Sequence, residues 1–142
     1  MTSVELDALR LQLIDHEGLR LRVYTDTVGK ATIGVGRNLV DKGITQPEAM
    51  MLLAHDIDEC VGDLETFGWF AALDPVRARA LCDLRFNLGA AKLRRFVKML
   101  DGFEQQNYGE AAAQLVDSLW ATQVGRGRVD RLVTMIRTGQ DA

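Results

Sequence analysis

The hydrophobic pattern changes period at Leu19, and this change constrains the fold more than any other feature of the chain. Before it, Leu6, Leu9 and Leu13 recur at helical spacing. After it, apolar residues alternate with arginines as in a strand, up to a polar turn over residues 25–29. Helical spacing then returns further along the chain. We therefore expect a helix, a small antiparallel hairpin and a second helix, in that order.

Local signals indicate where these helices begin and end. Two threonines are each followed three residues later by a glutamate, the spacing of a capping box at a helix N-terminus: Thr2 with Glu5, and Thr45 with Glu48. Gly18 is typical of a helix end, so the first helix should finish near His16. Pro47 suits the first turn of the second helix, which should run to about Glu65.

Beyond Phe67 the pattern predicts a cluster of short helices. Asp74 and Pro75 open one that ends at Gly89. Further helical segments are expected over residues 93–103, 108–119 and 129–136, broken near Gly102, Asn107 and residues 125–127. The fold class is therefore α+β and mostly helical. We expect one domain, residues 1–142, with a sheet lobe at 18–45, a connecting helix at 46–66 and a helical lobe formed by 1–17 and 67–142.

Composition narrows the class of protein. With 47% hydrophobic and 26% charged residues, the chain of 142 residues suits one globular domain. No apolar run approaches a membrane span, and the polar, acidic start does not resemble a signal peptide. We therefore expect a chain that is cytoplasmic in the producing cell and does not insert stably into a membrane. Cys60 and Cys82 form no CxxC motif and should be free thiols in a reducing compartment.

Charge is unevenly distributed along the chain. The net charge is −3, yet residues 75–137 carry eleven Lys or Arg against six Asp or Glu, while residues 41–74 carry eight acids and one base. A basic second half favours an anionic partner, such as nucleic acid or bacterial cell wall. Charge does not choose between the two.

Residues whose side chains could take part in catalysis lie between positions 15 and 37. Eight residues separate Glu17 from Asp26, and five more separate Asp26 from Thr32, so two acids and a hydroxyl fall at a helix end, a turn and a strand. The stretches over residues 14–21, 24–29 and 32–36 resemble the active-site block of the T-even type phage lysozymes, glycoside hydrolase family 24. The resemblance implies a lysozyme-like fold, in which a small hairpin lobe is joined by a long helix to a helical lobe.

The same resemblance implies a catalytic set of Glu17, Asp26 and Thr32. Glu17 would donate a proton to the leaving oxygen, while Asp26 and Thr32 hold the attacking water and the anomeric centre is inverted. Physical chemistry supports these roles, because the negative end of a helix dipole disfavours charge on Glu17 and so helps it to stay protonated. An inverting pair of carboxyl groups sits about 6.5–9.5 Å apart, which leaves space for the water.

Weaker similarity continues into the second half, at residues 86–89, 118–120, 123 and 131–139. It implies a set of substrate-binding residues: Gly36, Asn87, Trp120, Gln123 and Arg128. Either Arg128 or Arg131 could be the arginine that faces the active site. Arg37 stands where the T-even enzyme has a histidine, so the part that this residue plays is open.

The resulting hypothesis is a muramidase, or endolysin, of the glycoside hydrolase class. It would cleave the β-1,4 bond between N-acetylmuramic acid and N-acetylglucosamine in peptidoglycan, with the saccharide in a cleft between the sheet lobe and the basic helical lobe. No metal and no organic cofactor is implied. We expect a monomer that does not bind nucleic acid and that reaches the wall after release by a holin.

Three alternatives stay open at this stage. A zinc amidase would attack the same wall but needs more ligands than His16 and His55 provide. A lysozyme homologue could bind the wall without cutting it. A basic helical module could bind nucleic-acid phosphates through seven cations: Arg77, Arg79, Arg85, Lys92, Arg94, Arg95 and Lys98.

Overall fold

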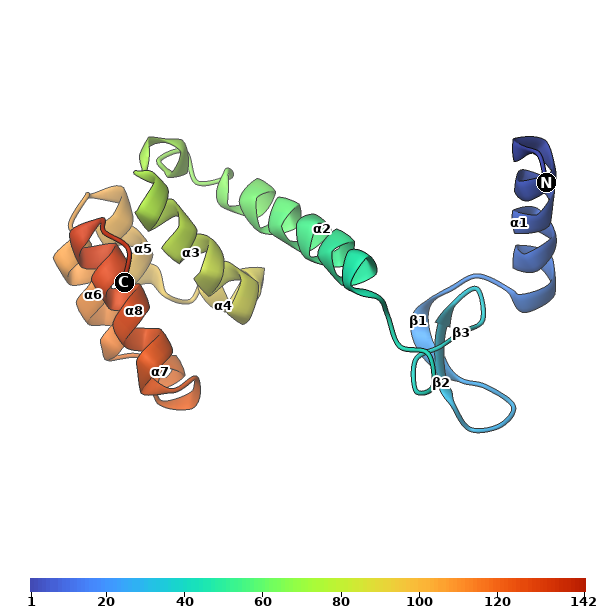
Figure 1. The fold of residues 1–142 in the computed structure, drawn as a ribbon. Helices are drawn as coiled ribbons and strands as arrows, with labels where there is room; N and C mark the ends of the chain where they lie inside the picture. The colour runs from blue at the N-terminus through green and yellow to red at the C-terminus, as the bar shows by residue number, and fades with distance from the viewer. The chain divides into compact units, whose positions relative to one another are not determined.

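The computed structural model describes residues 1–142, apart from the side chain of Leu119. The chain forms two compact units, residues 1–51 and 52–142. Helices account for most of the chain, and a single three-stranded antiparallel sheet accompanies them (Figure 1). The prediction of an α+β, mostly helical, lysozyme-like fold is confirmed.

The first unit contains a helix and the sheet. Helix α1 (Ser3–Glu17) begins with the predicted capping box at Thr2 and ends at Gly18. Strands β1 (Arg20–Thr25) and β2 (Ala31–Gly34) form the predicted hairpin, with Tyr24 opposite Thr32. A third strand, β3 (Arg37–Asn38), pairs with β2 and was not predicted, because two residues are too few to show a period.

Helix α2 (Gln46–Leu64) begins at the second predicted capping box. The Thr45 N–H donates to Oε2 of Glu48 (2.7 Å), and the Glu48 N–H donates to Oγ1 of Thr45 (3.3 Å). Arg37 joins this cap from β3, with two guanidinium nitrogens 3.1 and 2.6 Å from the carboxylate oxygens of Glu48. It also donates to the carbonyl of Gly43 (3.3 Å). Arg37 therefore fixes the segment between the sheet and α2.

The second unit consists of the end of α2 and seven further helical elements. These are the short 3₁₀ helix η1 (Phe70–Ala72) and helices α3 (Pro75–Leu88), α4 (Ala90–Leu93), α5 (Val97–Glu104), α6 (Tyr108–Val116), α7 (Leu119–Gln123) and α8 (Arg126–Thr138). Helix α6 packs against both α5 and α8 (Figure 1). The core comprises Leu64, Phe70, Ala80, Leu81, Leu84, Leu93, Met99, Leu100, Phe103, Ala111, Ala112, Leu115, Trp120, Val129, Leu132 and Ile136.

An ionic network ties the end of α2 to α3 and α4. Asp63 accepts from Nε of Arg85 (2.6 Å) and from both terminal nitrogens of Arg94 (3.0 and 2.7 Å). Arg85 is 8% exposed and also donates to Glu59 (3.2 Å). Hydrogen bonds from Arg94 first, and then from Arg85, hold the pKa of Asp63 below its usual value. A buried guanidinium needs such partners, so the network stabilises this end of α2.

The predicted break at Gly102 is wrong. Gly102 lies inside α5 and is buried. A Cβ atom at this position would lie 3.0 Å from the backbone nitrogen and the Cβ of Ala111 on α6. Glycine therefore permits close packing of two helices here, a tertiary reason that the local sequence does not reveal.

Other predicted boundaries in the second unit also need correction. The expected segment 93–103 is two helices, because α4 ends at Leu93 and α5 begins at Val97. The expected segment 108–119 ends early at Val116, and Ser118 caps α7 by accepting from the Ala121 N–H (3.3 Å). Gly125 precedes α8, which starts three residues before the predicted Val129.

Cys60 and Cys82 are both free thiols, as predicted. Burial is the main cause that raises the pKa of each. None of the helices that the structure describes is long and apolar enough to cross a membrane.

Candidate active site

Glu17 is the last residue of α1, and its carboxylate lies against Gly36, which directly precedes β3. A Cβ atom added at Gly36 would be 3.0 Å from Oε2 of Glu17. Gly36 also has a φ of +66°, which disfavours any other residue. The absence of a side chain at position 36 therefore leaves room for the carboxylate.

Asp26 is fixed in the turn between β1 and β2. Its Oδ1 accepts hydrogen bonds from the backbone N–H groups of Val28 (3.0 Å) and Lys30 (2.8 Å). The Asp26 N–H also donates to the carbonyl of Lys30 (2.9 Å), and the carbonyl of Asp26 accepts from the Gly29 N–H (3.1 Å). This is the side-chain and backbone bonding by which aspartate stabilises turns. Because these bonds use Oδ1, the second carboxylate oxygen can accept a hydrogen bond from another group.

Thr32 lies on β2, the central strand of the sheet, and is 2% exposed. Its hydroxyl donates to the carbonyl of Lys30 (3.0 Å), the same residue whose N–H holds Asp26. The hydroxyl oxygen keeps lone pairs that can accept. Asp26 and Thr32 are therefore positioned by one hairpin.

Three of the predicted substrate-binding residues come together in the second unit. Nε1 of Trp120 donates to Oδ1 of Asn87 (2.6 Å), which links α7 to α3. Both residues line a cavity of about 430 Å³, together with Gln123. Trp120 is 7% exposed, so most of the indole belongs to the core.

Arg128 is held apart from these three residues. Its Nε and a terminal nitrogen donate to Oδ1 of Asp83 on α3 (3.1 and 2.6 Å). It lines a different cavity, of about 370 Å³, with Asp83, Phe86 and both cysteines. Arg131 lines a third cavity, where Arg128 and Asp83 also contribute. The sequence did not predict that Arg128 forms an ion pair with Asp83, which connects α8 to α3.

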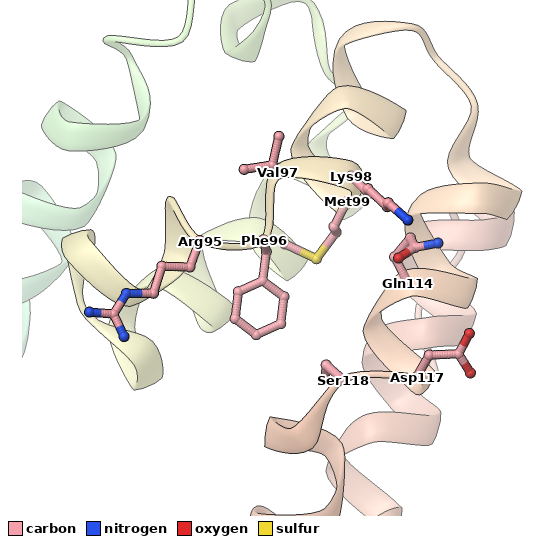
Figure 2. A pocket seen from close by; sticks show the side chains of 8 residues that line it. All are labelled: Arg95, Phe96, Val97, Lys98, Met99, Gln114, Asp117 and Ser118. Carbon is pink, nitrogen blue, oxygen red and sulfur yellow. The ribbon is translucent and has the colours of Figure 1, made fainter.

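The cavity of Asn87, Trp120 and Gln123 has further lining residues that sequence reasoning did not assign to it. Lys92, Arg95 and Phe96 all contribute to its wall. Arg95 and Phe96 also line an adjoining cavity of about 440 Å³, shown in Figure 2. The sequence signal was the run of cations over residues 92–98, interpreted above only as a possible phosphate-binding set.

The side chains offer acid, base and hydrogen-bond chemistry. In the first unit, two carboxyl groups and one hydroxyl are presented by a helix end, a turn and a strand. Two carboxyl groups in different surroundings can divide the tasks of proton donor and water-binding base in glycoside hydrolysis. Among the described residues, no group of three or more His, Cys, Asp or Glu gathers in a way that could hold a metal ion.

Comparison with known proteins identifies the class to which this fold and these residues belong. The profile of the family described as "Phage lysozyme" matches residues 14–136. That range extends over most of both units and includes all eight residues of the predicted site. The chain belongs to the phage lysozyme family and is a lysozyme-type peptidoglycan hydrolase.

Individual relatives agree with the family. The chain is 27% identical to "Probable T4-type lysozyme 2" of Dictyostelium discoideum, over 94% of this chain and 96% of that protein. It is 26% identical to "Probable T4-type lysozyme 1" of the same organism, over 87% of this chain and 89% of the relative. It is also 28% identical to "Pre-baseplate central spike protein Gp5" of Enterobacteria phage T4, over 87% of this chain but 26% of that longer protein.

Proposed function

We propose that the chain is a muramidase that hydrolyses the β-1,4 bond between N-acetylmuramic acid and N-acetylglucosamine. The observation that carries this proposal is the placement of Glu17. Its carboxylate lies at the end of α1, in the space that the missing side chain of Gly36 leaves for it. Asp26 and Thr32 are fixed by hydrogen bonds to Lys30 in the same unit.

In this proposal, the protonated carboxyl of Glu17 donates to the leaving oxygen of the glycosidic bond. The carboxylate of Asp26 accepts a proton from the attacking water, and the hydroxyl of Thr32 helps to orient that water. Because the water attacks opposite the leaving group in one step, the anomeric configuration inverts. Pre-organisation matters here, since the catalytic groups then need little rearrangement when the bond breaks.

The wider proposal concerns substrate contacts and context. Gly36, Asn87, Trp120 and Gln123 would contact the glycan, and Arg128 would support the site through its pair with Asp83. The 142 residues would act as one lysozyme domain and as a monomer, without nucleic acid. The chain would accumulate in the cytoplasm and reach the wall after holin-type release, causing bacterial lysis.

Product analysis tests the bond and the stereochemistry. Purified peptidoglycan is digested with the full chain, and the new reducing ends are labelled with borohydride and identified. We expect reduced muramic acid, and proton NMR of the fresh digest should show the α-anomer first. New glucosamine ends would refute the bond assignment, and an initial β-anomer would refute inversion. Wall binding without any new ends would favour the homologue that binds but does not cut.

A further inference from the structure

The cavity that contains Asn87, Trp120 and Gln123 also has two cations on its wall. Lys92 and Arg95 line it, and the lining residues that the structure describes include no acidic side chain. The chain as a whole carries a net charge of −3. The wall of this cavity is therefore positively charged although the chain as a whole is negatively charged. A positive wall attracts an anionic group.

The two cations are held on one short turn. The Arg95 N–H donates to the carbonyl of Lys92 (3.1 Å), and the Phe96 N–H donates to the carbonyl of Leu93 (3.0 Å). Leu93 is fully buried and anchors the turn in the core. The backbone positions of Lys92 and Arg95 are thus fixed relative to the cavity, so less ordering is needed when they bind a ligand.

The arginine that lies between these two cations in the sequence already has an acidic partner. Arg94 forms hydrogen bonds to both carboxylate oxygens of Asp63 (3.0 and 2.7 Å). Within the part of the chain that the structure describes, Lys92 and Arg95 form no ion pair. Figure 2 shows the guanidinium of Arg95 directed away from Asp117, the acid of the adjoining cavity. An anion could bind both cations without breaking an existing ion pair.

We propose that Lys92 and Arg95 bind free carboxylates on the side arm of muramic acid, while Asn87, Trp120 and Gln123 contact the glycan. This inference rests on the proposed function, because it names which form of the substrate the same cavity selects. Ammonium and guanidinium groups pair with carboxylates through charge-assisted hydrogen bonds. The carboxylates belong to the stem peptide or, where the peptide has been removed, to the lactyl group. Neutralising them should abolish the contribution of both cations.

Binding to insoluble peptidoglycan tests this proposal. The test protein is the full chain with Lys92→Gln and Arg95→Gln, compared with a control that carries Arg126→Gln and Arg137→Gln and so loses the same charge from α8. Every protein, including the reference chain, also carries Glu17→Gln to limit digestion. Three forms of the wall are used at low ionic strength: native, amidated at its carboxylates with carbodiimide and ammonia, and stripped of stem peptides by an amidase.

The expected result is about tenfold weaker binding of the test protein to native wall, which two partly exposed charge pairs would produce. Binding to amidated wall should be unchanged by the substitutions, and the control should lie within about twofold of the reference on both. An effect that persists on stripped wall shows that the two cations also bind the lactyl carboxylate that the amidase sets free, and one that disappears shows that they need the carboxylates of the stem peptide.

Three results would overturn the proposal. One is equal weakening on native and amidated wall, which would mean that no carboxylate is recognised. Another is an equal loss of binding in the α8 control, which would mean that the effect depends only on the net charge of the protein. The third is a loss confined to duplex DNA, measured in parallel, which would point to nucleic acid. Failure of the proposed function is distinguishable, because it would appear in the separate digestion experiment, where the unmodified chain with its natural Glu17 would release no reducing ends.

Discussion

At the scale of single residues, glycine determines two close approaches for different reasons. Gly36 leaves space for the carboxylate of Glu17, and Gly102 leaves space for the backbone of α6. The first approach concerns the candidate active site and the second concerns the core. Each close approach can be tested by a substitution of the glycine by alanine, which adds one methyl group. For each of the two, the chain offers a control glycine with a similar backbone conformation, where the added methyl group would meet no other atom.

Gly36→Ala should impair activity through Glu17. Both Gly36 and Gly34 have positive φ, at +66° and +68°, but a Cβ atom at Gly34 would meet nothing within 4 Å. Alanine at either position should cost about 1 kcal/mol of unfolding free energy from backbone strain. Only Gly36→Ala should also lower kcat/KM, by about tenfold or more, because it displaces the proton donor. Equal activity of the two variants in a wall-lysis assay would contradict the placement of Glu17.

Gly102→Ala and Gly62→Ala should change stability in opposite directions. A methyl group at Gly102 would lie 3.0 Å from the backbone nitrogen of Ala111, whereas one at Gly62 on α2 would meet nothing within 4 Å. We expect a loss of about 1–2 kcal/mol at Gly102 from overpacking and a gain of about 0.5–1 kcal/mol at Gly62 from helix propensity. Urea unfolding of both variants checks this. A gain at both positions would show that α5 and α6 can separate without cost.

At the scale of secondary-structure elements, charged side chains hold the two ends of α2. Arg37 and Thr45 bind Glu48 at its start, and Arg85 and Arg94 bind Asp63 near its end. Both carboxylates have lowered pKa values because cations donate to them. Acid should therefore weaken both attachments of this helix.

Glu48 provides a measurable pH dependence. Hydrogen bonds from Arg37 first, and then from Thr45, lower the pKa of Glu48 from 4.5 to about 2 in the folded chain. Since the folded pKa lies below the unfolded one, the stabilisation is complete above pH 4.5 and is lost as the pH falls towards 2. Thermal unfolding should show that Glu48→Gln lowers Tm at pH 6 but has a much smaller effect near pH 2. A difference in Tm that stays constant with pH would contradict this.

At the scale of the whole molecule, local signals predicted most of the fold. The capping boxes at Thr2 and Thr45 located the starts of α1 and α2, because a cap depends on residues within one turn. The error at Gly102 arose because contact with α6 is tertiary. Likewise, the apolar run through Leu115 and Val116 concealed the end of α6, which only Ser118 marked.

The candidate site was predictable to a similar extent. Asp26 and Thr32 could be placed on a turn and a strand from the sequence, because both roles are local. The pair of Arg128 with Asp83 and the position of Lys92 and Arg95 on a cavity could not, since they depend on how helices pack. Similarity to a family indicated the candidate catalytic residues, but it assigned no role to Lys92 or Arg95.

The central claim, that Glu17 is the proton donor of a wall-cleaving enzyme, is tested most directly by lysis. The rate of turbidity loss of outer-membrane-permeabilised bacteria is measured for the unmodified chain, Glu17→Gln and the exposed control Glu104→Gln, with circular dichroism to confirm folding. We expect Glu17→Gln to lower the rate by about 10²–10⁴-fold without loss of fold, since it removes the transferable proton but almost no volume. Glu104→Gln should change it little, and Asp26→Asn should be severe. Lysis by Glu17→Gln at the rate of the unmodified chain would contradict the account.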